Sequence, residues 1–437
     1  MTQRRLESGG MASCVARHSP RGIFAPGDFA GCRRSTAAAR TGYAGGRNYT
    51  SVISCDLRYK AGSRIKVRTM TAIPSEQTPA DGPQSQDLFR PSFLTGALWA
   101  GLASLVTLSI GFGSMAGPTA FAPADWYAHE GLYGYLAAII TGFCLGAAPL
   151  SGTKPVVLML AWLAGRVAIL ASGTIGAVVA GGIDSVFLLL AAAIVARMAL
   201  ADRGLLPQAG VLVAMAAGNV VFHLGMPGLG TRIGIAAVVL LVTLVSGRPI
   251  GPGTEAVPAA GRNLVDIATL AVSAAALLVW IVLPGTLVTG ILMLVGGLAQ
   301  VLRLIGWVRS RTQGTLMLIQ QLAYGLIPLG FLALASAAFR HEQPGPANVR
   351  AWLIAAIAIL TLAMVTHMDL GRDKPTGTLR MTAIVIYAAV AAVFVLRLLN
   401  GWLPILAPIA GVAWMVAFVV FVLGYLPLLA RPRTEAP

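Results

Sequence analysis

Apolar residues fill the chain from Phe93 onward, in continuous runs of about 20 residues separated by short connections. A run of this length crosses the hydrocarbon core of a bilayer as an α-helix. Strands of a membrane barrel are shorter and alternate apolar with polar positions, so these runs indicate helices. We therefore predict an all-α polytopic membrane protein of twelve spans, at residues 93–113, 130–150, 155–177, 183–200, 206–226, 231–247, 264–285, 286–306, 316–338, 349–367, 379–399 and 404–429.

Two connections between predicted spans are unusually short. The seventh and eighth spans meet at Pro284-Gly285, and the third and fourth meet at Gly181-Gly182. Proline interrupts a helix and glycine adopts backbone conformations that other residues avoid. We therefore predict that the chain reverses direction at both places.

The basic residues of the loops orient these spans. If the N-terminus is cytoplasmic, 14 of the 19 Lys and Arg residues after residue 70 fall on the cytoplasmic side. Four fall on the opposite side, and one, Arg166, lies inside a span. This bias follows the positive-inside rule. We predict that both termini are cytoplasmic, which agrees with an even number of spans.

Composition supports a membrane protein and removes nucleic acid as a partner. Apolar residues make up 57% of the chain and charged residues 11%, against about 25% charged in soluble domains. A net charge of +16 would suggest nucleic acid if it covered one surface. However, residues 1–70 hold 13 basic and 3 acidic residues, so most of the excess lies in one terminal segment. Membrane lipid is the predicted partner.

Residues 1–87 form a basic leader rich in Arg, Gly, Ala and Ser, without the apolar segment of a secretory signal. Three interpretations are open: a disordered tail, a transit-like peptide, or translated upstream sequence before a true start at Met70. We favour the third. The membrane domain then covers residues 88–430, and residues 431–437 form a short cytoplasmic tail.

The second predicted span begins with an unusual polar sequence, Trp126-Tyr127-Ala128-His129-Glu130. One interpretation is an interfacial belt, with aromatic rings at headgroup level and a hydrated His and Glu. The other is a metal or haem ligand backed by a carboxylate, because a ligating imidazole usually needs an acceptor for its second ring N–H. The sequence leaves both open.

Three more polar residues lie inside predicted spans. Asn219 and His223 are four residues apart and therefore share a helix face. They either form a hydrogen bond between helices or belong to a functional site. Arg166 lies near mid-membrane depth, where Glu130 and Asp184 are the candidate carboxylate partners. It either forms a structural ion pair or contacts a propionate or another anion.

Weaker polar signals occur in the later spans. Gln320, Gln321 and Tyr324 form a polar step near the cytoplasmic end of the ninth span, and His367 ends the tenth. They either form hydrogen bonds between helices or are ordinary polar residues near loops. Cys144 lies in an apolar run and is expected to be a small buried residue.

The order of the motifs is more specific than any one of them. FRPSFL at 89–94 is followed by WYAHE at 126–130, GYLAAIITGF at 134–143, WLAGR at 162–166, Asn219 with FHL at 222–224, and YGLIPLG at 324–330. This order resembles the NnrS family of twelve-span bacterial inner-membrane proteins, over about residues 88–430. The most specific parts of this resemblance are the run that opens and continues the second predicted span, at 126–143, and WLAGR.

The resemblance implies a haem- and copper-containing protein of the plasma membrane, associated with nitrosative-stress resistance and denitrification. Its ligand would be nitric oxide or another small molecule, and its chemical activity is not firmly defined. His129 and His223 match the family histidines and are therefore the expected haem or metal ligands. Arg166 matches the family's arginine. Three neighbouring residues complete the expected cofactor site: Glu130, Asn219 and Tyr127.

The chain also departs from the family pattern. Tyr127, Gln321 and Arg350 stand where the family has histidine. At the end of the tenth span, His367 stands at an arginine position and Arg372 at a histidine position. This chain is therefore a divergent member. If these histidines hold copper or one axial position of a haem in relatives, that function is expected to be weakened here. A Tyr can ligate haem, so Tyr127 is one candidate replacement, although loss of a ligand is the simpler interpretation.

Three functional hypotheses follow. The first is an NnrS-like haem-binding protein, with copper as a second candidate cofactor, that acts in the response to nitric oxide without a defined turnover. The alternative is a twelve-helix secondary transporter, which the helix number alone fits, although no sequence repeat supports it. A haem–copper oxidase or nitric oxide reductase subunit is discounted, because its catalytic centre needs more histidines than the four that the chain has outside its leader.

Overall fold

The chain divides into two compact units, Met1–Gly82 and Pro83–Pro437. The computed structural model describes residues 89–111, 119–146, 150, 153–245, 264–309, 315–341, 377–399, 403 and 405–429, together with four two-residue strands of the first unit. In that unit, β1 (Tyr43–Ala44) pairs antiparallel with β2 (Arg47–Asn48). Likewise β3 (Leu57–Arg58) pairs antiparallel with β4 (Arg64–Ile65).

The described part of the second unit is helical. Its elements are α1 (Phe89–Gly111), α2 (Pro123–His129), the π-helix η1 (Glu130–Leu136), α3 (Ala137–Gly146), α4 (Lys154–Leu170), α5 (Ser172–Ile175), α6 (Ala177–Ala201), the 3₁₀-helix η2 (Arg203–Leu205), α7 (Leu206–His223), α8 (Pro227–Val245), α9 (Leu264–Val282), α10 (Leu287–Arg309), α11 (Thr315–Phe339), α13 (Gly377–Leu399) and α14 (Leu406–Leu429).

The predicted all-α polytopic membrane architecture is confirmed. Eleven of the twelve predicted spans coincide with these helices, and the span predicted at 349–367 lies outside the described residues. Seven helices of the described chain are long and apolar enough to cross a membrane: α1, α6, α7 with η2, α8, α9, α10 and α11. The total of twelve stays a prediction.

Proline marks the start of several helices. It is the first or second residue of α2, α4, α7 and α8, at positions 123, 155, 207 and 227. The first turn suits proline because its missing N–H has no acceptor there in any helix. Between α6 and α7, the carboxylate of Asp202 accepts a hydrogen bond from the backbone N–H of Gly204 at 2.8 Å. The local sequence thus sets where these helices begin.

One predicted junction is confirmed and one is wrong. The chain reverses between α9 and α10 at Pro284-Gly285, where Gly285 has φ +84°. The break before α6, however, lies at Gly176 (φ +87°) and not at Gly181-Gly182, which are inside the helix. Glycine adopts a positive φ without steric cost, so the helix breaks at Gly176. The second span likewise begins at Pro123, so His129 lies at the end of α2 and does not open a helix.

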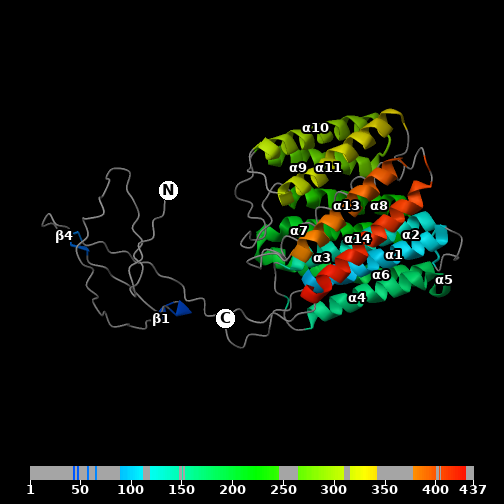
Figure 1. Ribbon diagram of the computed structural model, residues 1–437, viewed down its shortest axis with the longest axis horizontal. Coiled ribbons are helices and arrows are strands. Elements are labelled where there is room, and N and C mark those ends of the chain that lie inside the picture. The colour runs from blue at the N-terminus through cyan, green and yellow to red at the C-terminus, as the bar shows by residue number, and fades with distance from the viewer. Residues whose placement is uncertain are drawn as a thin grey trace. The chain divides into compact units, whose positions relative to one another are not determined.

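The helices of the second unit run side by side (Figure 1). Sequence neighbours pack together in the series α6, α7, α8, α9, α10 and α11, while α4 packs on α6. Helix α1 packs on α3, η1 and α14, which brings the two ends of this unit's helical sequence together. Large apolar side chains are exposed along α4, α6, α9 and α10, as expected of helices that face lipid.

A polar cluster joins α8, α9, α10 and α11. Arg303 donates from Nε to Asp266 at 2.7 Å and from Nη1 to the hydroxyl of Tyr324 at 2.8 Å. The Tyr324 hydroxyl donates to the amide oxygen of Gln300.

Interhelical hydrogen bonding is therefore confirmed for Tyr324. It is wrong for Gln321, whose buried side-chain amide has no hydrogen-bond partner among the described residues. The side chain of Gln320 and all of His367 lie outside the described residues. Cys144 is buried as predicted, with 3% of its surface exposed.

Candidate functional site: a buried ionic cluster

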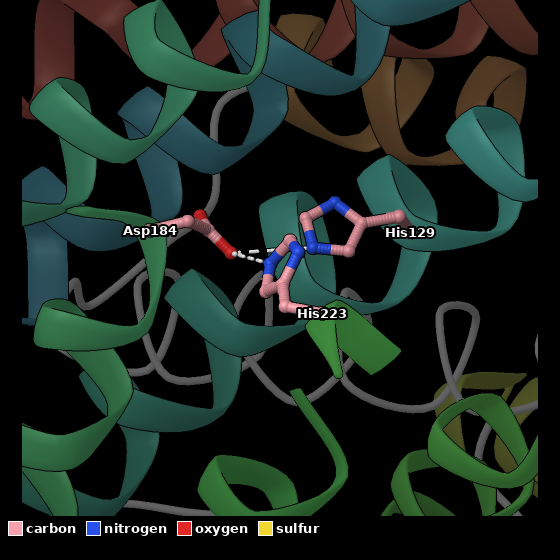
Figure 2. A group of neighbouring side chains, drawn as sticks. All are labelled: His129, Asp184 and His223. Atoms are coloured by element: carbon pink, nitrogen blue, oxygen red, sulfur yellow. Dashed lines mark hydrogen bonds and ion pairs between the residues drawn. The ribbon is translucent and has the colours of Figure 1, made fainter. Parts of the chain in front are cut away.

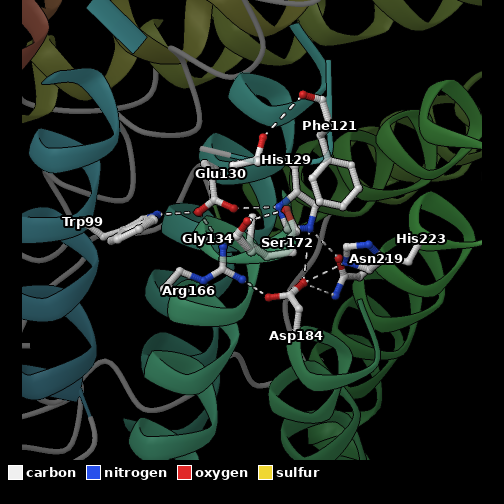
Figure 3. Close-up of polar contacts among 12 residues, drawn as sticks. Trp99, Phe121, His129, Glu130, Gly134, Arg166, Ser172, Asp184, Asn219 and His223 are labelled. Carbon is white, nitrogen blue, oxygen red and sulfur yellow. Dashed lines mark hydrogen bonds and ion pairs between the residues drawn. The ribbon is translucent and has the colours of Figure 1, made fainter. Parts of the chain in front are cut away.

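Six polar residues meet in the interior of the bundle, where α2, η1, α4, α6 and α7 approach one another (Figure 3). We call them the ionic cluster. Five of the six are at most 2% exposed, and the side chain of the sixth, His223, is 7% exposed. The cluster consists of His129, Glu130, Arg166, Asp184, Asn219 and His223.

Arg166 links the two carboxylates of the cluster. Its Nη1 donates to Oε2 of Glu130 at 2.6 Å, and its Nη2 donates to Oδ1 of Asp184. A buried charge persists only when it is paired and hydrogen-bonded. Both carboxylates expected as candidate partners for Arg166 are therefore confirmed as its partners. Arg166 extends from α4, so its guanidinium links η1 to α6 and fixes the distance between them.

Glu130 orients His129. Its Oε1 lies 2.9 Å from Nδ1 of His129, while its Oε2 accepts hydrogen bonds from Arg166 and from the indole of Trp99 at 2.6 Å. Trp99 extends from α1 and the Arg166 guanidinium lies 6.0 Å from its ring centre. The carboxylate therefore has fixed partners on both oxygens. Its effect is to aim the other ring nitrogen of His129, Nε2, at Asp184.

One oxygen of Asp184 collects the remaining contacts. Its Oδ2 accepts from Nδ2 of Asn219 at 2.9 Å and lies 3.2 Å from Nε2 of His129 and 3.1 Å from Nε2 of His223. Figure 2 shows both imidazoles directed at this carboxylate from different helices. Asn219 and His223 share one face of α7, as predicted from their spacing. Asp184 is therefore the centre of the cluster.

Aromatic rings close the side of the cluster around the histidines. Phe121 stacks parallel on His129 with ring centres 6.2 Å apart, and Phe222 lies 4.8 Å from the same ring. Tyr133 lies 5.4 Å from it and donates its hydroxyl to the carbonyl of Gly230 at 2.7 Å. These rings surround His129 with apolar surface. A low-polarity surrounding strengthens any electrostatic interaction inside it.

A glycine lets His223 reach the cluster. A Cβ placed on Gly181 of α6 would lie 2.6 Å from Cγ and 2.8 Å from Nδ1 of His223. Real side chains do not come so close, so only glycine permits this approach of the ring to the helix backbone. The sequence suggested a helix break at Gly181. Its contact with His223 shows instead that Gly181 makes space for the imidazole ring.

The donor atoms of the cluster fit a metal ion. One ligand atom from each of His129, Asp184 and His223 lies within 4.8 Å of the others. Donors held about 2.1 Å from an ion are themselves about 3.0–3.4 Å apart at octahedral or tetrahedral angles. The separations of 3.2 and 3.1 Å from Oδ2 of Asp184 fall in that range. His129 also has the carboxylate behind its second nitrogen that metal-bound histidines usually have.

A haem does not fit between the two histidines. Axial ligands approach a haem iron from opposite faces of a flat macrocycle. Here both Nε2 atoms lie next to the same carboxylate oxygen, and the ring centres are 4.9 Å apart at an interplanar angle of 59°. The spacing of the two rings therefore suits a small ion better than a haem held between them.

Five of the six residues predicted for the site lie together in the cluster. Tyr127 does not: its side chain is 44% exposed, because a residue two positions from His129 on a helix points to a different side. The sequence suggested Asp184 only as a partner for Arg166, and it did not point to Trp99 at all. An acidic residue within an apolar span was the available signal for Asp184. Trp99 carried no such signal.

Comparison with known proteins agrees with this architecture. The family model for the NnrS protein matches residues 86–433, which cover most of the chain. A search of curated proteins finds no match. The chain belongs to the NnrS family of proteins.

Proposed function

We propose that this membrane protein binds a redox-active transition metal at His129, Asp184 and His223 and acts in the response to nitric oxide. Its cellular place is the bacterial plasma membrane, and its context is nitrosative stress and denitrification. Family membership supports the context. The observation that carries the metal proposal is the convergence of two imidazoles on one buried carboxylate oxygen.

Copper is the metal best suited to these ligands. Imidazole and carboxylate donors bind divalent copper more tightly than the other first-row metals of the series. Copper also changes between two oxidation states, which is the chemistry that it would supply beside a small ligand such as nitric oxide. The protein's own residues hold and orient the donors: Glu130 fixes the ring of His129, and Arg166 fixes Asp184.

Haem is a proposed second cofactor, supported by family membership alone. The histidine pair does not fit a haem held between its members, so coordination through a single histidine is the form that we propose. An optical spectrum after haem-replete expression tests it. A Soret band that disappears in only one of the two histidine variants supports single coordination, whereas folded protein without a Soret band removes haem from the proposal.

Metal analysis of the purified full chain tests the copper proposal. We expect about one copper per chain after loading, and strong losses in His129→Ala, His223→Ala and Asp184→Asn. His341→Ala is the matched control, because His341 is an exposed turn residue after α11. Equal copper content in the cluster variants and the wild type, with all proteins folded, would overturn the proposal.

The proposed role in the response to nitric oxide needs a separate growth assay. A strain that lacks the protein should grow more slowly than its parent under nitric oxide release. The wild-type chain and His341→Ala should restore growth, and the cluster variants should not. Restoration by His129→Ala to the wild-type level would separate any protective effect from the metal site and contradict the proposal.

A further inference from the structure

The side-chain amide of Asn219 touches two of the three proposed metal donors. Its Nδ2 donates to Oδ2 of Asp184 at 2.9 Å, and its Oδ1 lies 3.1 Å from Nε2 of His129. Asn219 is 1% exposed and lies on α7, one turn before His223. Both ends of its amide therefore face the donor atoms (Figure 3).

The chemistry of its neighbours fixes which way the amide points. An ionised carboxylate only accepts hydrogen bonds, so the amide nitrogen must face Asp184. The amide oxygen then faces His129. This orientation presents a carbonyl-type oxygen next to the ring nitrogen that would bind a metal. The 3.1 Å separation matches the 3.1 and 3.2 Å separations of the other donors.

We propose that Oδ1 of Asn219 is the fourth protein donor of the metal site, which becomes a set of two histidines, one aspartate and one asparagine. The proposal rests on the metal site proposed above. Oδ1 of Asn219 lies 3.1 Å from Nε2 of His129, so it would be available to an ion held by that nitrogen. Nδ2 would keep its hydrogen bond to Asp184.

A neutral fourth donor also suits the charge of the cluster. Glu130 and Asp184 carry two negative charges and Arg166 one positive charge, which leaves one negative charge to balance an ion. An additional carboxylate would leave two negative charges and so favour a divalent over a monovalent ion, because uncompensated charge is poorly tolerated in this buried surrounding. Asparagine therefore allows both oxidation states of copper. Asn219→Asp should shift the preference toward divalent copper.

The alternative is that Asn219 only positions Asp184 through Nδ2. The two possibilities predict opposite orders of affinity. If the oxygen binds the ion, Asn219→Asp keeps a donor and retains divalent metal affinity, while Asn219→Leu weakens it by about tenfold or more. If Asn219 acts only through Nδ2, Asn219→Asp replaces that hydrogen bond with repulsion between its own carboxylate and that of Asp184. It should then lose at least as much metal affinity as Asn219→Leu.

The test uses the full chain in detergent, with Co²⁺ and Cu²⁺ titrations against a competing chelator. The visible spectrum of bound Co²⁺ reports the donor set directly, so we expect Asn219→Leu to change its bands as well as its affinity. Gln208→Leu is the matched control, because Gln208 is a buried amide on the same helix, three turns from Asn219. Thermal unfolding of each variant confirms that it is folded.

The outcomes separate the two proposals. If the wild type binds neither Co²⁺ nor Cu²⁺, the metal site itself is wrong. If the wild type binds metal, and Asn219→Leu shows the same Co²⁺ spectrum and an affinity within about threefold, the fourth donor is wrong and the metal site stands. A loss in both Asn219→Leu and Asn219→Asp with an unchanged Co²⁺ spectrum assigns Asn219 to positioning alone and overturns the inference.

Discussion

Nδ1 of His129 lies 2.9 Å from Oε1 of Glu130, the next residue along the chain. Successive residues of an α-helix point about 100° apart and do not normally face each other. Here the contact falls where α2 ends and the π-helix η1 begins. Single π-helical turns are frequent at functional sites. Trp162 donates to the carbonyl of Gly134 within η1 at 2.9 Å and so stabilises this irregular turn.

Glu130→Gln tests whether the carboxylate tunes His129. The amide keeps the shape of the side chain but removes its charge, so His129 becomes a weaker metal donor. We expect copper affinity to fall about 10–100-fold, as measured by chelator competition. Asp125→Asn is a matched control, because Asp125 is an acidic residue of α2 outside the ionic cluster. Equal affinities for Glu130→Gln and the control would contradict this part of the site.

Arg166→Met should damage the fold more than any histidine replacement. It leaves Glu130 and Asp184 buried without their positive partner, a loss that typically costs about 3–5 kcal/mol. We expect a low folded yield and a clear drop in the unfolding midpoint in detergent. Arg166→Lys should recover only part of the lost stability, because one ammonium cannot reproduce the fixed geometry with which the guanidinium reaches two carboxylates.

A compensating variant keeps that prediction testable if Arg166→Met does not fold. The triple change of Arg166→Met with Glu130→Gln and Asp184→Asn removes all three charges together. Replacing a complete buried ion pair with neutral groups is often tolerated. The triple variant should therefore be more stable than Arg166→Met alone. Lower stability in the triple variant would show that unpaired charge is not what destabilises Arg166→Met.

The sequence predicted the helices and the charge pairing of the cluster for physical reasons. Apolar runs mark spans because lipid leaves the backbone no other hydrogen-bond partner. The need for a counter-charge pointed to Glu130 and Asp184 as candidate partners of Arg166, and the structure pairs it with both. The breaks at Gly176 and at the α2–η1 boundary were missed, since local glycine content does not say which glycine takes positive φ. Only three-dimensional packing brings Asp184 between two histidines from different helices.

Tyr127 shows the limit of arguing from neighbours in a motif. It stands two residues from His129, so a linear motif includes both, yet helix geometry turns its ring away from the cluster. Tyr127→Phe should therefore leave copper content and the Soret region unchanged. A loss of either in Tyr127→Phe would return this residue to the site.

The predicted orientation can be checked with reporters. Both termini are expected in the cytoplasm because basic residues concentrate in alternate loops. Green fluorescent protein fused after Pro437 should fluoresce, and alkaline phosphatase fused there should be inactive. Fusions after His341, in a loop predicted on the other side, should behave in the opposite way. An active phosphatase at Pro437 would contradict the predicted orientation.

Gly181→Ala tests whether the site depends on the close approach of His223 to α6. The added methyl group would lie 2.6 Å from Cγ of His223, so either the ring or the helix must move. Alanine favours the helix by about 1 kcal/mol over glycine, so the backbone of α6 itself gains from the change. We expect folded protein with copper affinity reduced by about tenfold or more, because a ligand displaced by a fraction of an ångström no longer meets the other two. Gly182→Ala is the matched control, since a Cβ there meets no atom within 4 Å. If Gly181→Ala and Gly182→Ala bind copper equally well, His223 is free to move and its present position does not define the site.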